Sequence, residues 1–180
     1  MTTDGRRRKG EQRRRQLLDA TMRVIERAGV AAVSQRVVAQ EAGVPASAVT
    51  YYFPAIDDLL VAALADCNDD HLRRLDESAR APDPIAALAR VIAESSDARR
   101  AHAAAEYELF LLAGHRPELE PEVDRWTTAV DAYLAPHVTD PVRRAAVAAA
   151  VDGLFLRCFV ATDPPSADEV RALLASIIGC

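Results

Sequence analysis

The sequence predicts an all-α protein of about nine helices, and two observations support that prediction. Apolar residues recur at three- and four-residue steps along nearly the whole chain, which is the period of an amphipathic helix. Stretches that alternate apolar and polar residues, as in a half-buried strand, are few, and β-branched residues are thinly spread. We therefore expect a helical fold without a sheet.

The first predicted helix carries an apolar stripe that begins at Leu17 and Leu18. Gly29 ends this helix, because glycine readily adopts the left-handed backbone conformation that often follows a helix. A strongly basic segment precedes the stripe. We expect residues 1–10 to form a flexible basic arm ahead of the folded part of the chain.

Two short helices follow the first. Ser34 can cap one of them by accepting a hydrogen bond from a backbone N–H, and Gly43 closes it. The other runs to about Tyr52, after which Pro54 breaks the helical pattern. A longer apolar stripe then predicts a fourth helix over about residues 55–80.

The later helices are marked by capping residues at their starts, namely Asp83, Ser96 or Asp97, Asp140 and Ser166. Asp83 and Asp140 each precede a proline, which places a side-chain acceptor before a residue suited to the first helical position. Ser166 has a glutamate three residues further on, the pattern of a capping box. These signals complete the helical prediction.

The net charge of −5 is unevenly divided along the chain. Residues 1–53 carry ten Lys and Arg against five Asp and Glu, a balance of +5, whereas residues 54–180 have a balance of −10. A basic head on an acidic protein points to a polyanion that contacts one end only. A solvated basic tail would give the same count.

Other features narrow the class of protein and its compartment. No uninterrupted apolar run approaches the roughly 18 residues of a membrane helix, and the Arg-rich start continues into an amphipathic pattern rather than a signal peptide. The three cysteines, Cys67, Cys158 and Cys180, form no CxxC pair, which predicts a reducing compartment. We expect a soluble cytoplasmic protein that does not contact a membrane.

Residues 35–52 have the spacing of a helix-turn-helix. Ala39 is small enough to let two helices approach, and Gly43, four residues on, tolerates the positive φ of a tight turn. Apolar residues such as Val38 and Val49 stand where the two helices must pack. An ordinary pair of helices in a bundle would show any one of these features, so the combination is what favours a DNA-binding motif.

The run VSQRVVAQEAGVPASAVTYYFPAIDDLLVAAL, residues 33–64, resembles the DNA-binding region of the TetR family of bacterial transcriptional regulators. The resemblance extends over about residues 11–65. It implies a DNA-binding domain over 11–54, with its helix-turn-helix at about 33–52, and a helical ligand-binding and dimerisation domain over 55–180. It further implies a repressor that binds a palindromic operator as a homodimer and is released by a small-molecule effector.

Carried over by position, the resemblance implies that residues 45–51 form the recognition helix. The residues that it places on DNA are Gln35, Arg36, Ala46, Ser47, Ala48, Thr50 and Tyr51. The alanines can offer only methyl contacts to bases. We therefore expect sequence specificity to rest partly on Gln35, Arg36 and the shape of the DNA.

Two positions depart from the family pattern. Thr50 stands where the family commonly has a tyrosine, and Ile56 where it commonly has a lysine, and both losses remove contacts with the DNA backbone. We expect basic residues of the N-terminal segment to supply the missing phosphate or minor-groove contacts. These residues are Arg6, Arg7, Arg8 and Arg13, together with Lys9, Arg14 and Arg15.

Aromatic residues make up only 5% of the chain, yet most of them lie in its acidic part. Aromatic residues with a few polar anchors typically line small-molecule pockets, although each alone is more often a core or surface residue. The expected ligand-binding residues are His102, Glu106, Tyr107, Phe110, Trp126, Phe155 and Phe159, with Asp131 and Arg157 as further candidate anchors. His102 and Glu106 could share a metal ion, but no third ligand has convincing spacing, so no metal and no cofactor is predicted.

The last two helices, over 140–162 and 166–179, are expected to form a homodimer interface, as the resemblance implies. Small residues would let helices of two subunits approach closely, and leucine and isoleucine would supply apolar area. The expected interface residues are Ala146, Ala149, Ala150, Gly153, Leu173, Leu174 and Ile177. The alternative is that these residues pack within one subunit.

Enzyme motifs are lacking from the sequence. It contains no GxSxG elbow, HExxH pair or Gly-rich phosphate loop, so no catalytic residue is predicted. A helical protein-interaction module or a small all-α enzyme without DNA binding is the alternative to the regulator. In the regulator, ligand binding is expected to favour an arrangement of the fourth helix that changes the spacing of the two DNA-binding heads.

Overall fold

The computed structural model of the chain describes residues 3–96 and 99–179. Within these ranges nine α-helices and short 3-10 turns follow one another without a strand, which confirms the predicted fold class. The elements are α1 (Thr3–Ala28), η1 (Val30–Ala32), α2 (Gln35–Ala42), α3 (Ala46–Tyr52), α4 (Ile56–Ala79), α5 (Pro84–Ala93), α6 (Arg100–Leu112), η3 (Pro117–Leu119), α7 (Glu120–Leu134), α8 (Pro141–Val160) and α9 (Ala167–Ile178).

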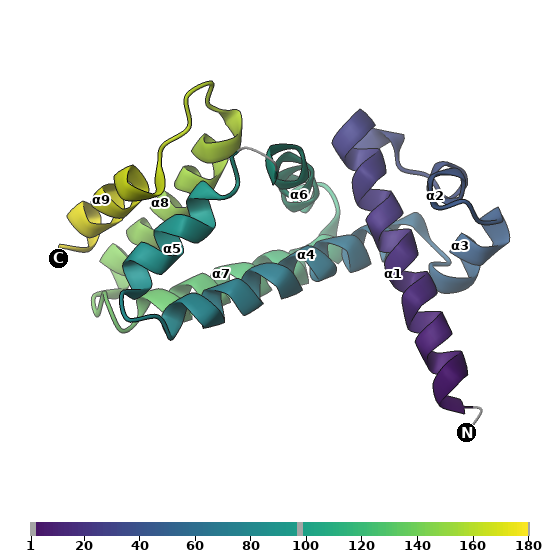
Figure 1. The fold of residues 1–180 in the computed structure, drawn as a ribbon, viewed down its shortest axis with the longest axis horizontal. Coiled ribbons are helices and arrows are strands. Elements are labelled where there is room, and N and C mark those ends of the chain that lie inside the picture. Colours follow the sequence, from purple (N-terminus) through teal and green to yellow (C-terminus); the bar gives the residue numbers. More distant parts are fainter. Residues whose placement is uncertain (1–2, 97–98, 180) are drawn as a thin grey trace.

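The helices form two packed groups joined by α4 and α6 (Figure 1). In one group, the head, α2 and α3 pack beside the long helix α1. In the other, α5 and α7 pack against the far part of α4, with α7 running alongside it, and α8 and α9 pack in turn against α5 (Figure 1). The helix α6 lies between the two groups and contacts α1, α4 and α8.

Two hydrophobic cores correspond to these groups, and α6 contributes to both. Ala105 and Leu109 of α6 are buried in the core of the head, at 1% and 0% exposure. Tyr107 and Phe110 of the same helix pack against the second core, which Trp126 and the apolar faces of α5, α8 and α9 build. A single helix therefore closes both cores.

Most of the expected helix caps are present. The side chains of Asp83, Asp140 and Ser166 each accept a hydrogen bond from a backbone N–H in the first turn of their helices. Ser96 does not cap the following helix, because α6 begins at Arg100 with Arg99 as its N-cap; the Ser96 hydroxyl instead donates to the carbonyl oxygen of Ala93 at 2.8 Å. The other candidate cap, Asp97, lies outside the described residues.

The N-terminal segment is not a separate arm where the structure describes it. Residues 3–10, which we expected to be flexible, form the first turns of α1 and continue into the helix that enters the core. Arginine, lysine, glutamate and glutamine favour helices, and they fill most of residues 6–16. The start of α1 consequently projects beyond the head, with the N-terminus at its tip (Figure 1).

Membrane-spanning character is weak in the described part of the chain. No single helix there is both long and apolar enough to cross a membrane. The helices α3 and α4 reach the necessary length and composition only when taken together, across a bend of 71°. Both contribute buried residues to the core of the head, among them Val49 and Leu59, which are fully buried.

Gly43 provides a test of the tight turn between α2 and α3. Its φ of 65° lies in the left-handed region, and a Cβ there would meet nothing within 4 Å, so a substitution is penalised by the backbone alone. Gly43→Ala is expected to lower the free energy of unfolding by about 1 kcal/mol in urea denaturation.

Gly10 is the matched control, because it lies within α1 and a Cβ there would make an ordinary 3.7 Å contact with Tyr52 Oη. Gly10→Ala should leave the free energy of unfolding unchanged or raise it by up to about 1 kcal/mol. Equal losses from the two substitutions would contradict the requirement for a left-handed residue at Gly43.

Candidate DNA-binding and ligand-binding sites

The predicted helix-turn-helix is formed by α2 and α3. Val38 of α2 and Val49 of α3 are fully buried, and Ala39 is only 3% exposed. The turn is closed by Gly43 in the left-handed conformation and by a hydrogen bond from the Val44 N–H to the carbonyl oxygen of Ala39 at 2.9 Å. The small residue and the glycine therefore occupy the positions that the sequence spacing indicated.

The recognition helix α3 presents one face to solvent. Ala46, Ser47 and Thr50 are exposed, Ala48 is half-buried, and Tyr51 is 80% exposed. Helix-turn-helix proteins place a face of this kind in the major groove of DNA. The structure therefore leaves accessible the side chains that the resemblance places on DNA.

Gln35 is engaged inside the head. Its Nε2 donates to the carbonyl oxygens of Phe53 and Pro54, both at 3.0 Å, and its Oε1 accepts from the Thr50 hydroxyl at 3.3 Å. These bonds tie the start of α2 to the end of α3, so the amide must give them up to contact a base. We expected Gln35 to contact bases, and the sequence did not reveal these hydrogen-bond partners inside the head. Arg36, the other residue of α2 predicted to contact DNA, is exposed.

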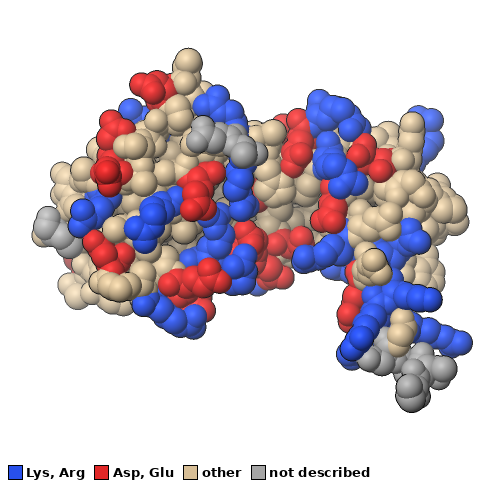
Figure 2. Space-filling view, viewed as in Figure 1, with Lys and Arg blue, Asp and Glu red and all other residues tan. Residues whose placement is uncertain are grey.

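The basic residues of α1 fall into two groups. Those on its projecting end are exposed, namely Arg6, Arg7, Arg8 and Lys9, and Figure 2 shows Lys and Arg gathered there. Further along α1, Arg13 donates to Gln16 at 2.9 Å and Arg15 pairs with Asp66 of α4 at 3.0 Å. In the first group, Arg7 likewise pairs with Glu11 at 3.7 Å, so residues of both groups make contacts within the chain.

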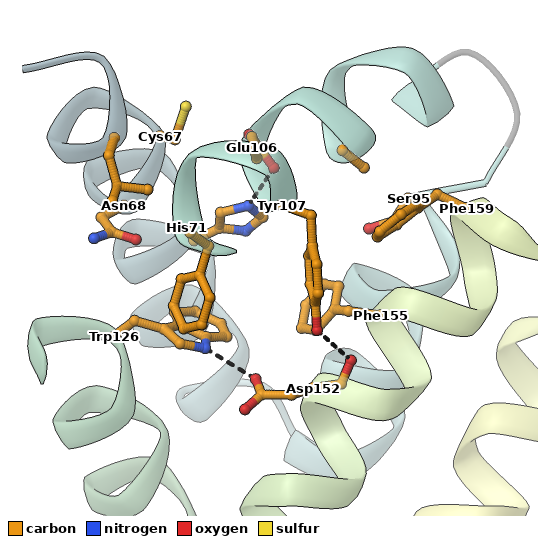
Figure 3. A pocket seen from close by; sticks show the side chains of 13 residues that line it. Cys67, Asn68, His71, Ser95, Glu106, Tyr107, Trp126, Asp152, Phe155 and Phe159 are labelled. Carbon is orange, nitrogen blue, oxygen red and sulfur yellow. Dashed lines mark hydrogen bonds and ion pairs between the residues drawn. The ribbon is translucent and has the colours of Figure 1, made fainter. Parts of the chain in front are cut away.

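A small cavity of about 60 Å³ lies between α4, α6, α7 and α8 (Figure 3). Its lining residues are Leu64, Cys67, Asn68, His71, Ser95, Ala103, Glu106, Tyr107, Phe110, Trp126, Asp152, Phe155 and Phe159. Six of the seven residues expected to bind ligand thus meet in one place. They come from α6, α7 and α8, which the sequence alone could not bring together.

Asp152 of α8 is the polar centre of one wall (Figure 3). Its Oδ1 accepts from Trp126 Nε1 at 3.0 Å, and its backbone carbonyl accepts from the Tyr107 hydroxyl at 3.0 Å. Burial raises the pKa of Asp152, and the bond from Trp126 offsets this only in part. No Lys or Arg lines the cavity, so this carboxylate has no basic side chain of that kind beside it.

Glu106 occupies the opposite wall and is shared by two histidines. Its Oε2 lies 2.9 Å from His71 Nε2, and its Oε1 lies 3.1 Å from His102 Nε2. Burial alone would raise the pKa of Glu106, but the contacts with His102 and His71 lower it to about 2. The bond with Glu106, together with a second to Glu26, raises the pKa of His102 to about 9 although the ring is partly buried.

The helix α6 also links the cavity to the head. His102 Nδ1 lies 2.7 Å from Glu26 Oε1 on α1. Six residues further along α6, Glu108 Oε2 accepts from the backbone N–H of Val30, the first residue of η1, at 2.7 Å. Any displacement of α6 therefore acts on the C-terminal end of α1.

Three expected polar anchors lie elsewhere. His102 does not line the cavity and faces a neighbouring cleft between α1, α4 and α6. Asp131 points away and pairs with Arg144 at 2.6 Å, and Arg157 is exposed on the outer face of α8. Each of these residues lies one or two positions in sequence from a residue on the inward-facing side of its helix. Composition does not show which side of a helix a residue faces.

Sequence reasoning missed several residues of the cavity, among them Asn68, His71 and Asp152. The signal for His71 was present, since it continues the apolar stripe of the fourth helix and a histidine there must be buried or paired. Its Nδ1 is indeed buried with no hydrogen-bond partner among the described residues. Asp152 similarly interrupts an otherwise apolar stretch of α8.

Most of the expected interface residues lie on an exposed face of α8 and α9. Ala146, Ala149, Gly153, Leu173 and Ile177 are exposed and Ala150 is half-buried. Leu174 is the exception and corrects the prediction, because it is fully buried in the second core and cannot contact another subunit. It follows Leu173 directly, and because successive residues are about 100° apart around an α-helix, one can face the core while the other faces solvent.

The exposed face of α8 is more apolar than expected. Val142, Leu156 and Val160 are 77%, 41% and 65% exposed. With Ala146, Ala149 and Gly153 they follow alternating steps of four and three residues, which places all six on one stripe. Such a continuous apolar stripe on a helix surface marks a site of association.

An exposed helix-turn-helix joined to a helical body with an aromatic cavity defines a DNA-binding regulator with a ligand site. Two family profiles match the chain. "Bacterial regulatory proteins, tetR family" matches residues 17–63, and "Tetracyclin repressor-like, C-terminal domain" matches residues 79–179. The chain belongs to the TetR family of bacterial regulatory proteins.

Individual proteins show the same similarity. The chain is 28% identical over 177 residues to the HTH-type transcriptional regulator BetI 1 of Chromohalobacter salexigens, covering 89% of this chain and 86% of the relative. A TetR-family structure from Streptomyces coelicolor A3 is 36% identical with a TM-score of 0.81, covering 92% and 97% of the two chains. The multidrug binding protein EbrR in complex with ethidium is also 36% identical, with a TM-score of 0.76 and the same coverage.

Members of this family bind operator DNA, act as dimers and respond to small-molecule effectors. The chain is therefore a ligand-responsive transcriptional regulator. The family assignment predicted from the helix-turn-helix is confirmed, and the second profile extends it to the helical body.

The half-buried carboxylate of Asp152 gives a prediction about pH. Because burial raises the pKa of Asp152 in the folded chain, its contribution to stability is present at low pH and is lost as the pH rises through the folded pKa. Asp152→Asn keeps an acceptor for Trp126 and removes the charge. Its melting temperature at pH 7 should therefore exceed that of the parent, and the gain should shrink as the pH falls toward the ordinary range of aspartate.

Asp131→Asn is the control, since it removes a carboxylate that is paired with Arg144 outside the cavity. It should lower the melting temperature or leave it unchanged at pH 7. Circular dichroism melts at several pH values compare the three proteins. A gain in the Asp152 variant that stays constant with pH would contradict the assigned cause.

Proposed function

We propose that this chain is a cytoplasmic repressor that leaves its operator when a cationic aromatic molecule enters the cavity. The observation that carries the proposal is Asp152, a half-buried carboxylate in a cavity lined by aromatic rings and by no Lys or Arg. We infer that the chain acts by binding alone and not as an enzyme. In this proposal residues 11–54 bind DNA and residues 55–180 bind ligand and dimerise.

The aromatic rings that line the cavity can bind a cationic group as well as the apolar surface of a ligand. Trp126 and Phe155 lie edge to face with ring centroids 5.9 Å apart, and Tyr107 and Phe159 lie 5.1 Å apart. A ligand cation over such rings is attracted by their π-electron density, and a carboxylate beside it adds a charge of opposite sign. The solved complexes of EbrR with ethidium, proflavin and malachite green support this ligand class.

The size of the cavity explains why a ligand would change the structure. At about 60 Å³ it holds a few water molecules, whereas sites for drug-sized ligands typically enclose about 300–1,000 Å³. An aromatic cation must therefore push apart the helices that form the walls. The helices α4 and α6 lead from these walls to the head, so widening the cavity moves both connections.

Release from DNA follows from the contacts of α6 with α1. His102 pairs with Glu26, and Glu108 accepts from the Val30 N–H, so a shift of α6 pulls on the end of α1. We expected the fourth helix to transmit the signal, and α4 does line the cavity through Asn68 and its neighbours. In the proposal α6 moves together with α4, and the two heads of the dimer lose their operator spacing.

On the operator, each head would place α3 in the major groove. The proposed contacts are Arg36 and the exposed residues of α3, with Gln35 joining them only if its internal hydrogen bonds open. The exposed stripe of α8, with Leu173 and Ile177 of α9, would join two subunits. Two such heads match the two half-sites of a palindrome.

The basic end of α1 is expected to contribute phosphate contacts. A variant with Arg6, Arg7, Arg8 and Lys9 all changed to glutamine keeps residues that favour a helix and removes four charges. If it loses two phosphate contacts per subunit, the slope of log K against log salt should fall by about 1.8 per subunit. Filter binding to a genomic fragment selected for affinity would measure the slope.

The control changes Arg80 and Arg90 to glutamine, because both are exposed, Arg80 directly follows α4 and Arg90 lies on α5, and this end of α4 and α5 lie far from the head (Figure 1). Its slope should equal that of the parent. The role of the basic end is refuted if the fourfold variant also keeps the parental slope.

Ligand class is tested with proflavin in the absence of DNA. Trp126 is the single tryptophan of the sequence and lines the cavity, so its fluorescence reports on occupancy. Proflavin should quench it saturably, and Asp152→Asn should weaken binding by about 10- to 100-fold, the effect of losing a charged partner. Asp131→Asn should bind as the parent does.

Two outcomes would argue against a cation site. One is an equal affinity of the Asp152 and Asp131 variants for proflavin. The other is equally tight binding of a neutral aromatic molecule of the same size, because the carboxylate would then contribute nothing.

A further inference from the structure

Three side chains that commonly ligate metals meet between α4 and α6. The Cys67 thiol, a ring nitrogen of His102 and a carboxylate oxygen of Glu106 all lie within 4.8 Å of one another. His102 and Glu106 are one helical turn apart on α6, and the sequence offered no third ligand at convincing spacing. Cys67 supplies it from α4, 35 residues before His102, through tertiary packing.

The surroundings suit a soft, positively charged ion. Cys67 is 6% exposed, and its sulfur lies 3.9 Å from the sulfur of Met22 on α1. The three ligands also line a cleft that opens to solvent between α1, α4 and α6. That cleft carries the carboxylates of Asp19, Glu26, Asp66, Asp69, Asp70 and Glu106 against three arginines. An ion can therefore reach the ligands through an acidic entrance.

We propose that Cys67, His102 and Glu106 form a binding site for a divalent ion of the zinc type. One thiolate, one imidazole and one carboxylate, with a fourth position left to water, match the coordination that Zn²⁺ takes in open sites. The thiolate disfavours Mg²⁺ and Ca²⁺, which prefer oxygen ligands alone. Binding forms bonds from the ion to sulfur, nitrogen and oxygen and releases to solvent the protons that Cys67 and His102 carry.

This site goes beyond the proposed function, since its occupation requires neither operator DNA nor an organic ligand. An ion there would bridge α4 and α6 directly. It would also take His102 as a ligand, the residue that pairs with Glu26 of α1. The ion and Glu26 of the head therefore either compete for the imidazole of His102 or each bind one of its two nitrogens.

Cobalt is the probe for this site, because Co²⁺ replaces Zn²⁺ in such sites and its thiolate complexes absorb light by charge transfer. A full-length variant with Cys158→Ala and Cys180→Ala keeps Cys67 as the one cysteine of the sequence. Titration with Co²⁺ should give a saturable charge-transfer band that added Zn²⁺ removes. Adding Cys67→Ala to this variant should abolish the band.

A second variant keeps the test valid if removal of the buried Cys67 disturbs folding. His102→Gln affects a more exposed side chain, at 36% exposure, and should weaken Co²⁺ binding at least about tenfold. His137→Gln, outside the cluster, should bind Co²⁺ as its parent does. Circular dichroism melts establish that each variant is folded.

The proposal is overturned if the variant with Cys67 alone gives no charge-transfer band, or if the band survives Cys67→Ala. It is also overturned if His137→Gln weakens binding as much as His102→Gln. Operator binding and proflavin quenching are measured without metal, so failure of this site leaves the proposed function standing, and the reverse also holds.

Discussion

The position of α6 between two hydrophobic cores is the constraint on which the rest of the structure depends. Leu109 is fully buried in the core of the head, while Tyr107 packs against the second core and bonds to the backbone of Asp152. Close-packed interiors do not deform continuously, so a helix held on two sides shifts as a unit or not at all. A molecule that widens the cavity by moving α6 must therefore also shift α6 against the head.

The strengths of these contacts show what each one does. Burying a leucine such as Leu109 contributes about 1.5–3 kcal/mol, whereas the hydrogen bond from Val30 to Glu108 contributes about 0.5–1.5 kcal/mol net. Apolar burial therefore holds α6 in place, and the polar bonds set its orientation against α1. Coupling between sites typically amounts to about 1–3 kcal/mol, so reorienting those polar bonds suffices and the core need not open.

Local signals in the sequence predicted the local structure well. Gly43 and the capping serine at Ser166 act over a few residues, and the structure has both where the spacing placed them. The sequence could not show which residues of distant helices would meet. Cys67 joins His102 only through tertiary packing, and Leu174 differs from Leu173 in facing the core, which depends on the rotation of α9 against its neighbours.

The head itself bears on how, in the proposed function, a small change at the cavity would be enough to control DNA binding. Among the proposed contacts, Ala46 and Ala48 offer bases only methyl groups, and Gln35 is held by its bonds inside the head, so each head would make few strong base contacts. Affinity then depends on both heads binding at once, because the first raises the effective concentration of the second. A change in their spacing forfeits that gain entirely, whereas a head with many base contacts would stay bound by itself. In the proposed function, therefore, the few base contacts of each head are what would let the distance between the two heads control operator binding.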